Sequence, residues 1–223
     1  MGLKFVGPES PTKKKCIILL HGAGANRHDL APLKSILDSK AQYDWYFPEA
    51  PINQNPVFNM NIWFPVSEIV DLVTNPRSDI SVLESYVPPL IDRARVYLDD
   101  FVLPLLDSYE DILIGGFSQG AMMALDFFVR NPRPNIKGLV AMSGTLADVG
   151  TWNKIPDAAP RPPVFQSHGD DDPILPERFG KQLLQFLSSK NFPVEFHGFH
   201  GGHEIPDYVL KSLSEYIPRA FNG

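Results

Sequence analysis

Residues 112–121 contain a glycine–serine–glycine pattern that could supply a catalytic nucleophile. The centre of this segment reads Gly116-Phe117-Ser118-Gln119-Gly120, with an apolar run at residues 112–114 before it and a helix-forming stretch at residues 122–129 after it. A Gly-x-Ser-x-Gly pattern between a strand and a helix is typical of a nucleophile elbow. We therefore predict that Ser118 acts covalently, the alternative being a glycine-rich turn with an ordinary serine.

The residue types around Ser118 agree with the geometry of such an elbow. A strand that turns sharply into a helix strains the backbone of its middle residue, and side chains two positions away would collide. Gly116 and Gly120 have no Cβ and avoid that collision. The amide of Gln119 would then lie at the helix N-terminus, where unpaired N–H groups stabilise a developing negative charge.

A serine hydroxyl becomes a useful nucleophile when a base removes its proton, and the usual base is a histidine oriented by a carboxylate. In folds with this elbow the chain order is Ser, then Asp or Glu, then His, each at the carboxyl end of a strand. Strands predicted at residues 163–166 and 194–197 are followed by the candidates Asp170, Asp171 and Asp172 and by His200 and His203, with His197 ending the second strand.

Spacing alone does not choose among the three aspartates. His203 is favoured over His197 and His200 because it lies farthest past its strand and follows two glycines, which let the loop fold back. His197 is expected to alternate within the strand. His168 precedes the acidic run and is expected to pack or form a hydrogen bond in its own turn.

The acidic run Asp170-Asp171-Asp172 also raises the question of a metal site. Consecutive carboxylates point in different directions, and no spaced pair of histidines accompanies them. We expect no bound metal, and we expect at least one of the three carboxylates to be solvated.

The loop after the first long strand, His21-Gly22-Ala23-Gly24-Ala25-Asn26, could supply a second oxyanion donor. Glycines on both sides of Ala23 allow its amide to approach a substrate carbonyl oxygen. The alternative is a turn that cradles phosphate, but the glycine-rich nucleotide-binding patterns are absent from this segment.

Apolar runs and helical patterns alternate along the chain. Strands are predicted at residues 16–20, 44–47, 112–114, 138–142, 163–166 and 194–197. Helices are predicted at residues 29–37, 82–105, 122–129, 179–187 and 208–217, with Pro88 and Pro89 inside the first turns of the second, and residues 48–65 form a proline- and asparagine-rich connection. This alternation predicts an α/β fold with a doubly wound, mostly parallel sheet, helices on both faces, one domain over residues 1–223 and no large cap domain.

Composition limits the class of protein. The net charge of −6 and the absence of a basic block longer than Lys13-Lys14-Lys15 disfavour nucleic acid as a partner. Cys16 is the only cysteine, so an intrachain disulfide is excluded, and we expect this residue to be a small buried apolar group. No signal-peptide core or bilayer-length apolar run is recognised, so a cytoplasmic location without an integral membrane segment is expected.

Several anchors together resemble the acyl-protein thioesterase, carboxylesterase and phospholipase family of α/β-hydrolases. In chain order they are His21-Gly22-Ala23-Gly24, Phe47-Pro48-Glu49-Ala50-Pro51, Ile62-Trp63-Phe64, the elbow with Ala121, residues 138–144, His168-Gly169-Asp170 through Pro176, and Gly202-His203. The resemblance implies a Ser118–Asp172–His203 triad, the amides of Ala23 and Gln119 as oxyanion donors, and no cofactor. It also implies hydrolysis of carboxylic esters, thioesters or lysophospholipids.

This chain departs from the family pattern beside its first His-Gly pair. Where the thioesterase branch has a large aliphatic residue and an aspartate, this sequence has Ala23 and Ala25, and Leu175 replaces a valine in the acid motif. By resemblance, Phe58, Met60, Trp63 and Phe64 border the acyl pocket, the alternative being that they cover the sheet edge. A small or lipid-like acyl ester is the expected substrate. The alternative functions are a serine peptidase and a non-enzymatic receptor on the same fold. The oligomeric state stays open, with a homodimer as one option.

Overall fold

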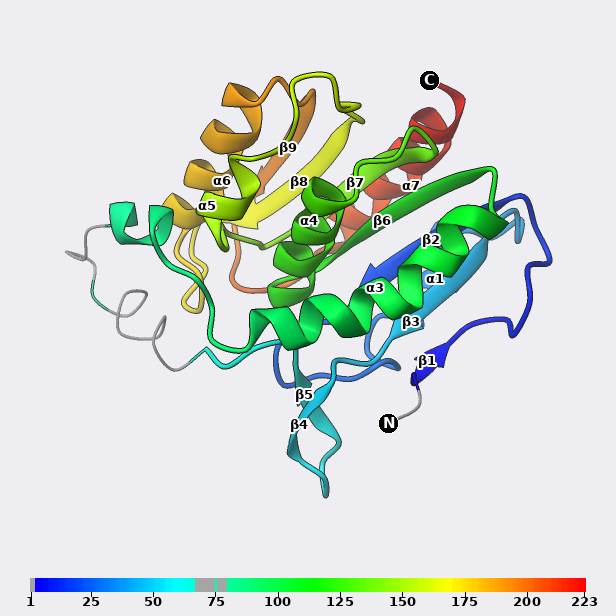
Figure 1. Cartoon of the computed structure of the whole chain (residues 1–223), viewed down its shortest axis with the longest axis horizontal. Coiled ribbons are helices and arrows are strands. Elements are labelled where there is room, and N and C mark those ends of the chain that lie inside the picture. Colours follow the sequence, from blue (N-terminus) through cyan, green and yellow to red (C-terminus); the bar gives the residue numbers. More distant parts are fainter. Residues whose placement is uncertain (1–2, 67–74, 76–79) are drawn as a thin grey trace.

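The structure is a computed structural model that describes residues 3–66, 75 and 80–223. Its centre is a seven-stranded sheet with the strand order β1-β3-β2-β6-β7-β8-β9 (Figure 1). All neighbouring strands run parallel except β1, which pairs antiparallel with β3 at one edge. The strands are β1 (Phe5–Val6), β2 (Lys15–Leu20), β3 (Asp44–Pro48), β6 (Asp111–Phe117), β7 (Ile136–Met142), β8 (Val164–Gly169) and β9 (Val194–Phe199).

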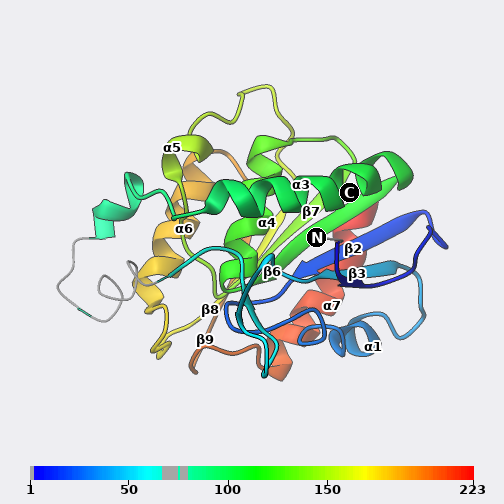
Figure 2. The same cartoon turned by 60° about the horizontal axis from the view of Figure 1, so that its bottom comes forward.

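Helices cover both faces of this sheet. The helical elements are α1 (Leu33–Leu37), the short 3-10 helix η1 (Ile80–Glu84), α3 (Ile91–Ser108), α4 (Gln119–Arg130), α5 (Val149–Trp152), α6 (Glu177–Ser189) and α7 (Asp207–Asn222). In Figure 2, α1 and α7 lie on the opposite side of the sheet from α3 and α4. The predicted doubly wound, mostly parallel sheet with helices on both faces is therefore confirmed, and no large cap domain is found among the residues that the structure describes.

The sheet is buried on both faces because its central strands are apolar at nearly every position. In β2, Cys16, Ile18 and Leu20 join the core under α3 and α4, whereas Ile17 and Leu19 join the core under α1 and α7. Strands that alternate between two cores read as continuous apolar runs, which is how parallel sheets differ from sheets with one wet face. The expectation that Cys16 is a buried apolar group is confirmed.

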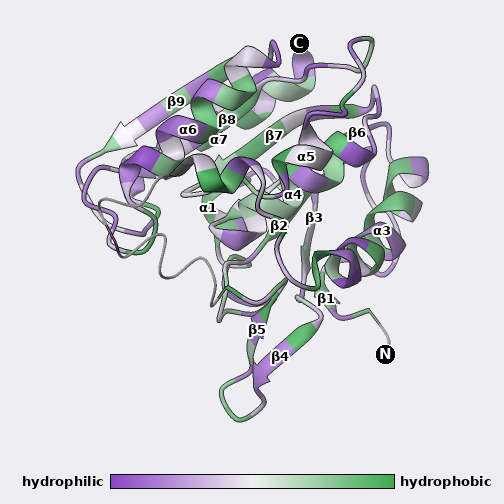
Figure 3. Cartoon of the chain, turned by 60° about the vertical axis from the view of Figure 1, so that its left-hand side comes forward, coloured by the Kyte–Doolittle hydropathy of each residue, from purple (hydrophilic) through white to green (hydrophobic). Residues whose placement is uncertain are grey.

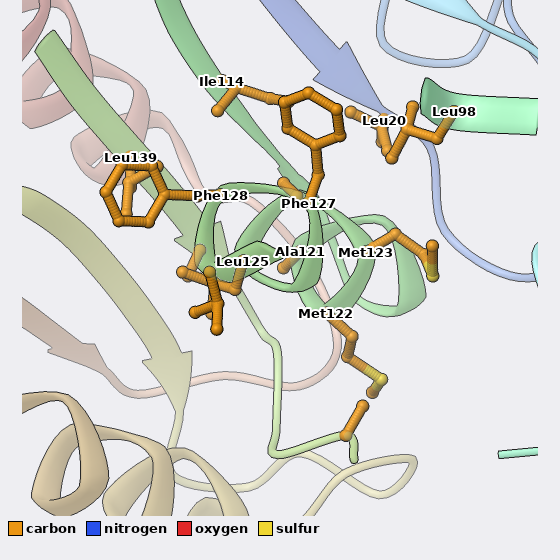
Figure 4. Packing of buried hydrophobic residues seen from close by; sticks show 14 of the residues in the cluster. Leu20, Leu98, Ile114, Ala121, Met122, Met123, Leu125, Phe127, Phe128 and Leu139 are labelled. Carbon is orange, nitrogen blue, oxygen red and sulfur yellow. The ribbon is translucent and has the colours of Figure 1, made fainter. Parts of the chain in front are cut away.

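Helix α4 is enclosed by the rest of the molecule. All its residues from Gln119 to Val129 are buried, and all of them except Gln119 and Asp126 are apolar or glycine, as expected of a helix that is enclosed in the core. Figure 4 shows Phe127 and Phe128 of this helix packed near Ile114 and Leu139 of the sheet. The element that follows Ser118 is thus held on all sides.

Three expectations from the sequence differ from the structure. The helix predicted at residues 82–105 is divided into η1 and α3, because Pro88 and Pro89 lie before α3 and Leu90 adopts a positive φ of 59°. The helix predicted at residues 29–37 begins only after Pro32, at Leu33. The connection at residues 48–65 contains a hairpin of β4 (Ile52–Asn55) and β5 (Met60–Ile62), which projects from the body in Figure 3.

The described helices were also compared with the dimensions of a bilayer. None of them has both the length and the apolar character that a membrane-spanning segment requires.

Candidate active site

Ser118 stands at a sharp turn between a strand and a helix. Strand β6 ends at Phe117, helix α4 begins at Gln119, and Ser118 between them has φ 55° and ψ −121°. A non-glycine residue at positive φ is strained and persists where its surroundings determine it, and at Ser118 this strain agrees with the sharp turn of a nucleophile elbow. The Ser118 amide is held by the carbonyl oxygen of Met142 at 2.8 Å.

The two glycines of the elbow are required by close backbone contacts. A Cβ on Gly116 would lie 2.5 Å from the carbonyl oxygen of Leu20 and 2.5 Å from the carbonyl carbon of Gly120. A Cβ on Gly120 would overlap the carbonyl oxygen of Leu20. The prediction that both positions exclude a side chain is confirmed, and its reason is now specific: the start of α4 lies directly against the end of β2.

Asp172 is held in the turn after β8 by its own side chain. Its Oδ1 accepts the amide N–H groups of Ile174 and Leu175, both at 2.8 Å, and its Oδ2 faces Nδ1 of His203 at 2.7 Å. Burial raises the pKa of Asp172, but the hydrogen bonds from His203, Leu175 and Ile174 outweigh burial, so the pKa lies below its ordinary value. The buried carboxylate is therefore the ionised acceptor for His203.

His203 lies in the turn after β9. Because a carboxylate can only accept, Nδ1 of His203 carries the proton in this hydrogen bond, and Nε2 is the nitrogen left to act as a base. The imidazole ring packs on Phe117, the residue before Ser118, with 4.8 Å between ring centroids. The structure thus brings Asp172 and His203 together beside the elbow; it contains no hydrogen bond between His203 and Ser118.

The turns after β8 and β9 continue the pairing of these two strands. The amide of Asp170 donates to Phe199 at 2.9 Å and the amide of Asp171 donates to Gly201 at 3.0 Å. A Cβ on Gly169 would overlap the carbonyl oxygens of Gly201 and Gly202. This close crossing is what carries Asp172 to His203.

The other sequence candidates lie elsewhere. Asp170 and Asp171 are exposed and lie 3.2 and 3.9 Å from Nδ1 of His200. Among the described residues, the side chains of Asp170, Asp171 and His200 form one exposed cluster in which the atoms that could bind a metal ion lie within 4.8 Å of one another. Asp172 is not part of this cluster. His197 pairs with Glu195 at 2.8 Å, within β9.

His168 is fully buried at the end of β8. Its Nε2–H donates to the carbonyl oxygen of Leu175 at 2.6 Å, and Nε2 lies 3.7 Å from Oδ2 of Asp172. Burial lowers the pKa of His168, which keeps the ring neutral. His168 thus links the end of β8 to Leu175 in the turn that contains Asp172, and the prediction that it forms a hydrogen bond in its own turn is confirmed.

Two backbone amides near Ser118 are unpaired. Neither the Ala23 amide nor the Gln119 amide donates a hydrogen bond to any residue that the structure describes. A Cβ on Gly22 would lie 3.3 Å from Cβ of Ser118, so the loop after β2 lies against the elbow. Two amides without a partner among the described residues, one in the loop that lies against Ser118 and one in the residue after it, could serve as the donors of an oxyanion hole.

The hairpin β4–β5 pairs with this same loop. The Gly24 amide donates to the carbonyl oxygen of Asn61 at 2.8 Å, and Ala25 forms a bridge with Asn61. Gly24 has a φ of 81°, a conformation that glycine adopts without strain. The hairpin base is therefore anchored at the site.

The four predicted pocket residues lie in two different environments. Trp63 and Phe64 have no exposed surface and belong to the core. Phe58 is 71% exposed near the hairpin tip, and Met60 is 37% exposed, with its Cε 3.5 Å from the Cβ position of Gly24. Met60 is thus the partly exposed member of the set that lies against the loop of Ala23.

Comparisons with known proteins agree with this arrangement. The sequence profile of the phospholipase/carboxylesterase family matches residues 1–220. The chain is similar to carboxylesterase SOBER1 of Arabidopsis thaliana, with 28% identity over 214 residues that cover 93% of this chain and 91% of that protein. It is 32% identical to acyl-protein thioesterase 1 of Debaryomyces hansenii over 226 residues, which cover 92% of this chain and 90% of that protein.

A solved structure gives the same result. The crystal structure of esterase PE8 has a TM-score of 0.77 and 28% identity to this chain, and the match covers 99% of this chain and 100% of that one. The chain therefore belongs to the phospholipase/carboxylesterase family and is a hydrolase with the α/β-hydrolase fold.

Proposed function

We propose that this protein hydrolyses carboxylic esters and thioesters through an acyl-enzyme on Ser118. The observation that carries the proposal is the 2.7 Å hydrogen bond between Asp172 and His203, which leaves Nε2 of His203 available as a base on a ring that packs against Phe117, the residue before Ser118. The Ser118–His203 hydrogen bond is absent here, and such bonds commonly tighten only when substrate binds.

The reaction has two matched halves. Nε2 of His203 takes the proton of Ser118 as Oγ attacks the acyl carbon, and the negative oxygen that forms is stabilised by the amides of Ala23 and Gln119. The carbon–oxygen or carbon–sulfur bond then breaks, and the leaving alcohol or thiol takes its proton from His203. Water, deprotonated by His203, attacks the acyl-enzyme; the bond between the acyl carbon and Oγ then breaks, Ser118 takes the proton from His203, and the acid is released. Asp172 stabilises the imidazolium in both halves.

The surroundings favour a small or lipid-like acyl ester as substrate. The side chains beside the oxyanion amides are small, since Ala23 and Ala25 flank Gly24, and the thioether of Met60 supplies an apolar wall. Each oxyanion donor contributes about 3 kcal/mol of transition-state stabilisation. The proposed reaction needs no cofactor.

The test is the removal of the Ser118 hydroxyl. Ser118→Ala should retain the circular dichroism spectrum and Tm of the wild type but lose p-nitrophenyl acetate hydrolysis by several orders of magnitude. Wild-type protein should take up one fluorophosphonate per chain, and the variant none. Turnover by Ser118→Ala at the wild-type rate would refute the proposal, and stoichiometric labelling without any turnover would favour a receptor.

A further inference from the structure

The side chain of Gln119 connects the start of α4 to the segment after β5. Its Oε1 accepts the amide N–H of Trp63 at 2.8 Å, and its Nε2 donates to the carbonyl oxygen of Phe64 at 2.7 Å. Gln119 is only 1% exposed, so both hydrogen bonds lie away from water, where an unpaired amide would be costly. The residue is therefore fixed through its side chain as well as through the helix.

Trp63 extends this connection to the loop after β2. Its indole Nε1–H donates to the carbonyl oxygen of His21 at 3.0 Å, and its ring lies 5.6 Å from the imidazole of His21, centroid to centroid. Trp63 has no exposed surface. Trp63 thus forms hydrogen bonds with both segments: its main-chain N–H binds the side chain of Gln119, and its indole binds His21 at the start of the loop that contains Ala23.

The ring of His21 completes the connection. The main-chain N–H of Ala50 can only donate, so Nε2 of His21 is the acceptor in their 3.0 Å hydrogen bond. The ring proton is therefore on Nδ1, which donates to the carbonyl oxygen of Gly22 at 2.7 Å. Burial lowers the pKa of His21, in agreement with this neutral form. The carbonyl directly before the Ala23 amide is thereby held in place.

We propose that Trp63 is a positioning residue that fixes the two oxyanion amides relative to each other. The Ala23 amide belongs to the loop after β2 and the Gln119 amide to α4, and Trp63 joins these two segments by hydrogen bonds at both its backbone and its indole. An oxyanion hole acts only when its donors are held in place before the charge develops, and a displacement of about 1 Å can cost a hundredfold in rate. The inference rests on the proposed function of Ser118.

The three tryptophans of the chain provide a matched experiment. All are buried, and each indole N–H forms one hydrogen bond of similar length: Trp63 to His21 at 3.0 Å, Trp45 to Asp38 at 3.0 Å and Trp152 to Asp126 at 3.1 Å. Tryptophan to phenylalanine removes the same donor and the same volume at each position. Only the acceptor of Trp63 belongs to the proposed oxyanion loop.

Trp63→Phe should lower kcat for p-nitrophenyl acetate about tenfold to a hundredfold with KM changed less than about twofold. Inhibition by a trifluoromethyl ketone, whose adduct with serine carries an oxyanion, should weaken by the same factor as kcat/KM. Trp45→Phe and Trp152→Phe should lower the Tm at least as much but leave kcat and the inhibition constant within about twofold. Rates are normalised to the fraction of chains that a fluorophosphonate labels.

A second variant tests the other end of the connection and protects against misfolding of the first. Gln119→Met removes both side-chain hydrogen bonds while keeping the main-chain amide, and it should reproduce the loss of kcat and of inhibitor affinity. The inference is overturned if Trp63→Phe and Gln119→Met lose no more kcat than the two control variants, or if the loss appears in KM alone. Wild-type turnover in Ser118→Ala would overturn the proposed function itself, which separates the two failures.

Discussion

Three consecutive aspartates occupy one turn, and their surroundings divide them. Asp172 is 4% exposed and its two oxygens accept three hydrogen bonds, whereas Asp170 and Asp171 are exposed and face His200. A carboxylate orients a histidine best where water does not compete for it, since electrostatic interactions strengthen as solvent is excluded. Position within the turn, and not the type of residue, decides which carboxylate can serve His203.

This division makes a residue-level prediction. Asp172→Asn should lower kcat by up to about ten-thousandfold, because the amide can present its NH₂ group to Nδ1 and favour the wrong tautomer of His203. Asp170→Asn and Asp171→Asn, which keep the same shape, should stay within about threefold of the wild type. Steady-state hydrolysis of p-nitrophenyl acetate measures all three. Equal losses in the three variants would contradict the assignment of Asp172.

The sequence alone could locate this acid only to within three residues. Its order after the elbow and its place after a strand follow from the fold, but the three carboxylates share that position, and resemblance to a family was needed to select Asp172. The physical signal lies in the main chain: Oδ1 of Asp172 accepts the amides of Ile174 and Leu175, a local turn that aspartate commonly forms. The side-chain role of Gln119 had no such local signal, because its partners lie far away in sequence.

At the scale of elements, the packing of α6 on β8 supports the acid turn. His168, on β8, holds the carbonyl of Leu175 and packs against Gly180 of α6. A Cβ on Gly180 would lie 2.6 Å from Cγ of the His168 ring, which is too close for any real contact. The helix can therefore approach the strand at this point only through a glycine.

Gly180→Ala should therefore destabilise the protein, although alanine is favoured over glycine inside a helix by about 1 kcal/mol. The overlap with His168 should lower the free energy of unfolding by about 1–3 kcal/mol and, by shifting the acid turn, reduce kcat about tenfold. Gly150→Ala in α5 is the matched control, because the nearest atom to its Cβ would be at an ordinary 3.6 Å. Urea unfolding and ester hydrolysis measure both effects; a stabilised, fully active Gly180→Ala would refute this account.

Elements were predictable where an apolar pattern was strong and failed where it was weak. The central parallel strands were found because both of their faces are buried. The hairpin β4–β5 was missed because residues 52–62 contain four asparagines and one proline, residue types that are depleted in strands, and β1 because two residues show no alternation. The division between η1 and α3 was missed because the prediction placed Pro88 and Pro89 inside the first turns of one helix over residues 82–105, whereas α3 begins only at Ile91.

At the scale of the whole molecule, one edge of the sheet collects the site. Ser118 follows β6, Asp172 follows β8, His203 follows β9 and Ala23 follows β2, so all four lie at the carboxyl ends of parallel strands. Parallel connections bring these ends together whatever lies between them in sequence. This is why chain order, together with the rule that sites form at the carboxyl ends of parallel strands, was sufficient to predict the neighbourhood of the site.

Charged side chains join the helices on one face of the sheet. Arg95 of α3 contacts Asp126 of α4 and Asp148 at the start of α5, both at 2.6 Å, and Arg130 contacts Asp126 at 2.9 Å. Asp126 has no exposed surface, and the indole of Trp152 also donates to it. A buried network of this kind is costly when one member is lost, because the remaining charges stay unpaired.

Asp148 makes this network sensitive to acid. Burial raises the pKa of Asp148, but hydrogen bonds from Arg95 and Thr151 outweigh burial, so its pKa lies below the ordinary value of 3.8. A depressed carboxyl pKa contributes stability that is present above pH 3.8 and is lost as the pH falls through the folded-state value.

Asp148→Asn should therefore lower the free energy of unfolding at pH 7 by about 1–3 kcal/mol and flatten its decline below pH 4. Asp157→Asn, at an exposed residue without a hydrogen bond or ion pair to any described residue, should retain the wild-type profile. Urea unfolding from pH 7 to pH 3 measures both variants, and a decline in Asp148→Asn as steep as in the wild type would show that this carboxylate does not contribute to acid sensitivity.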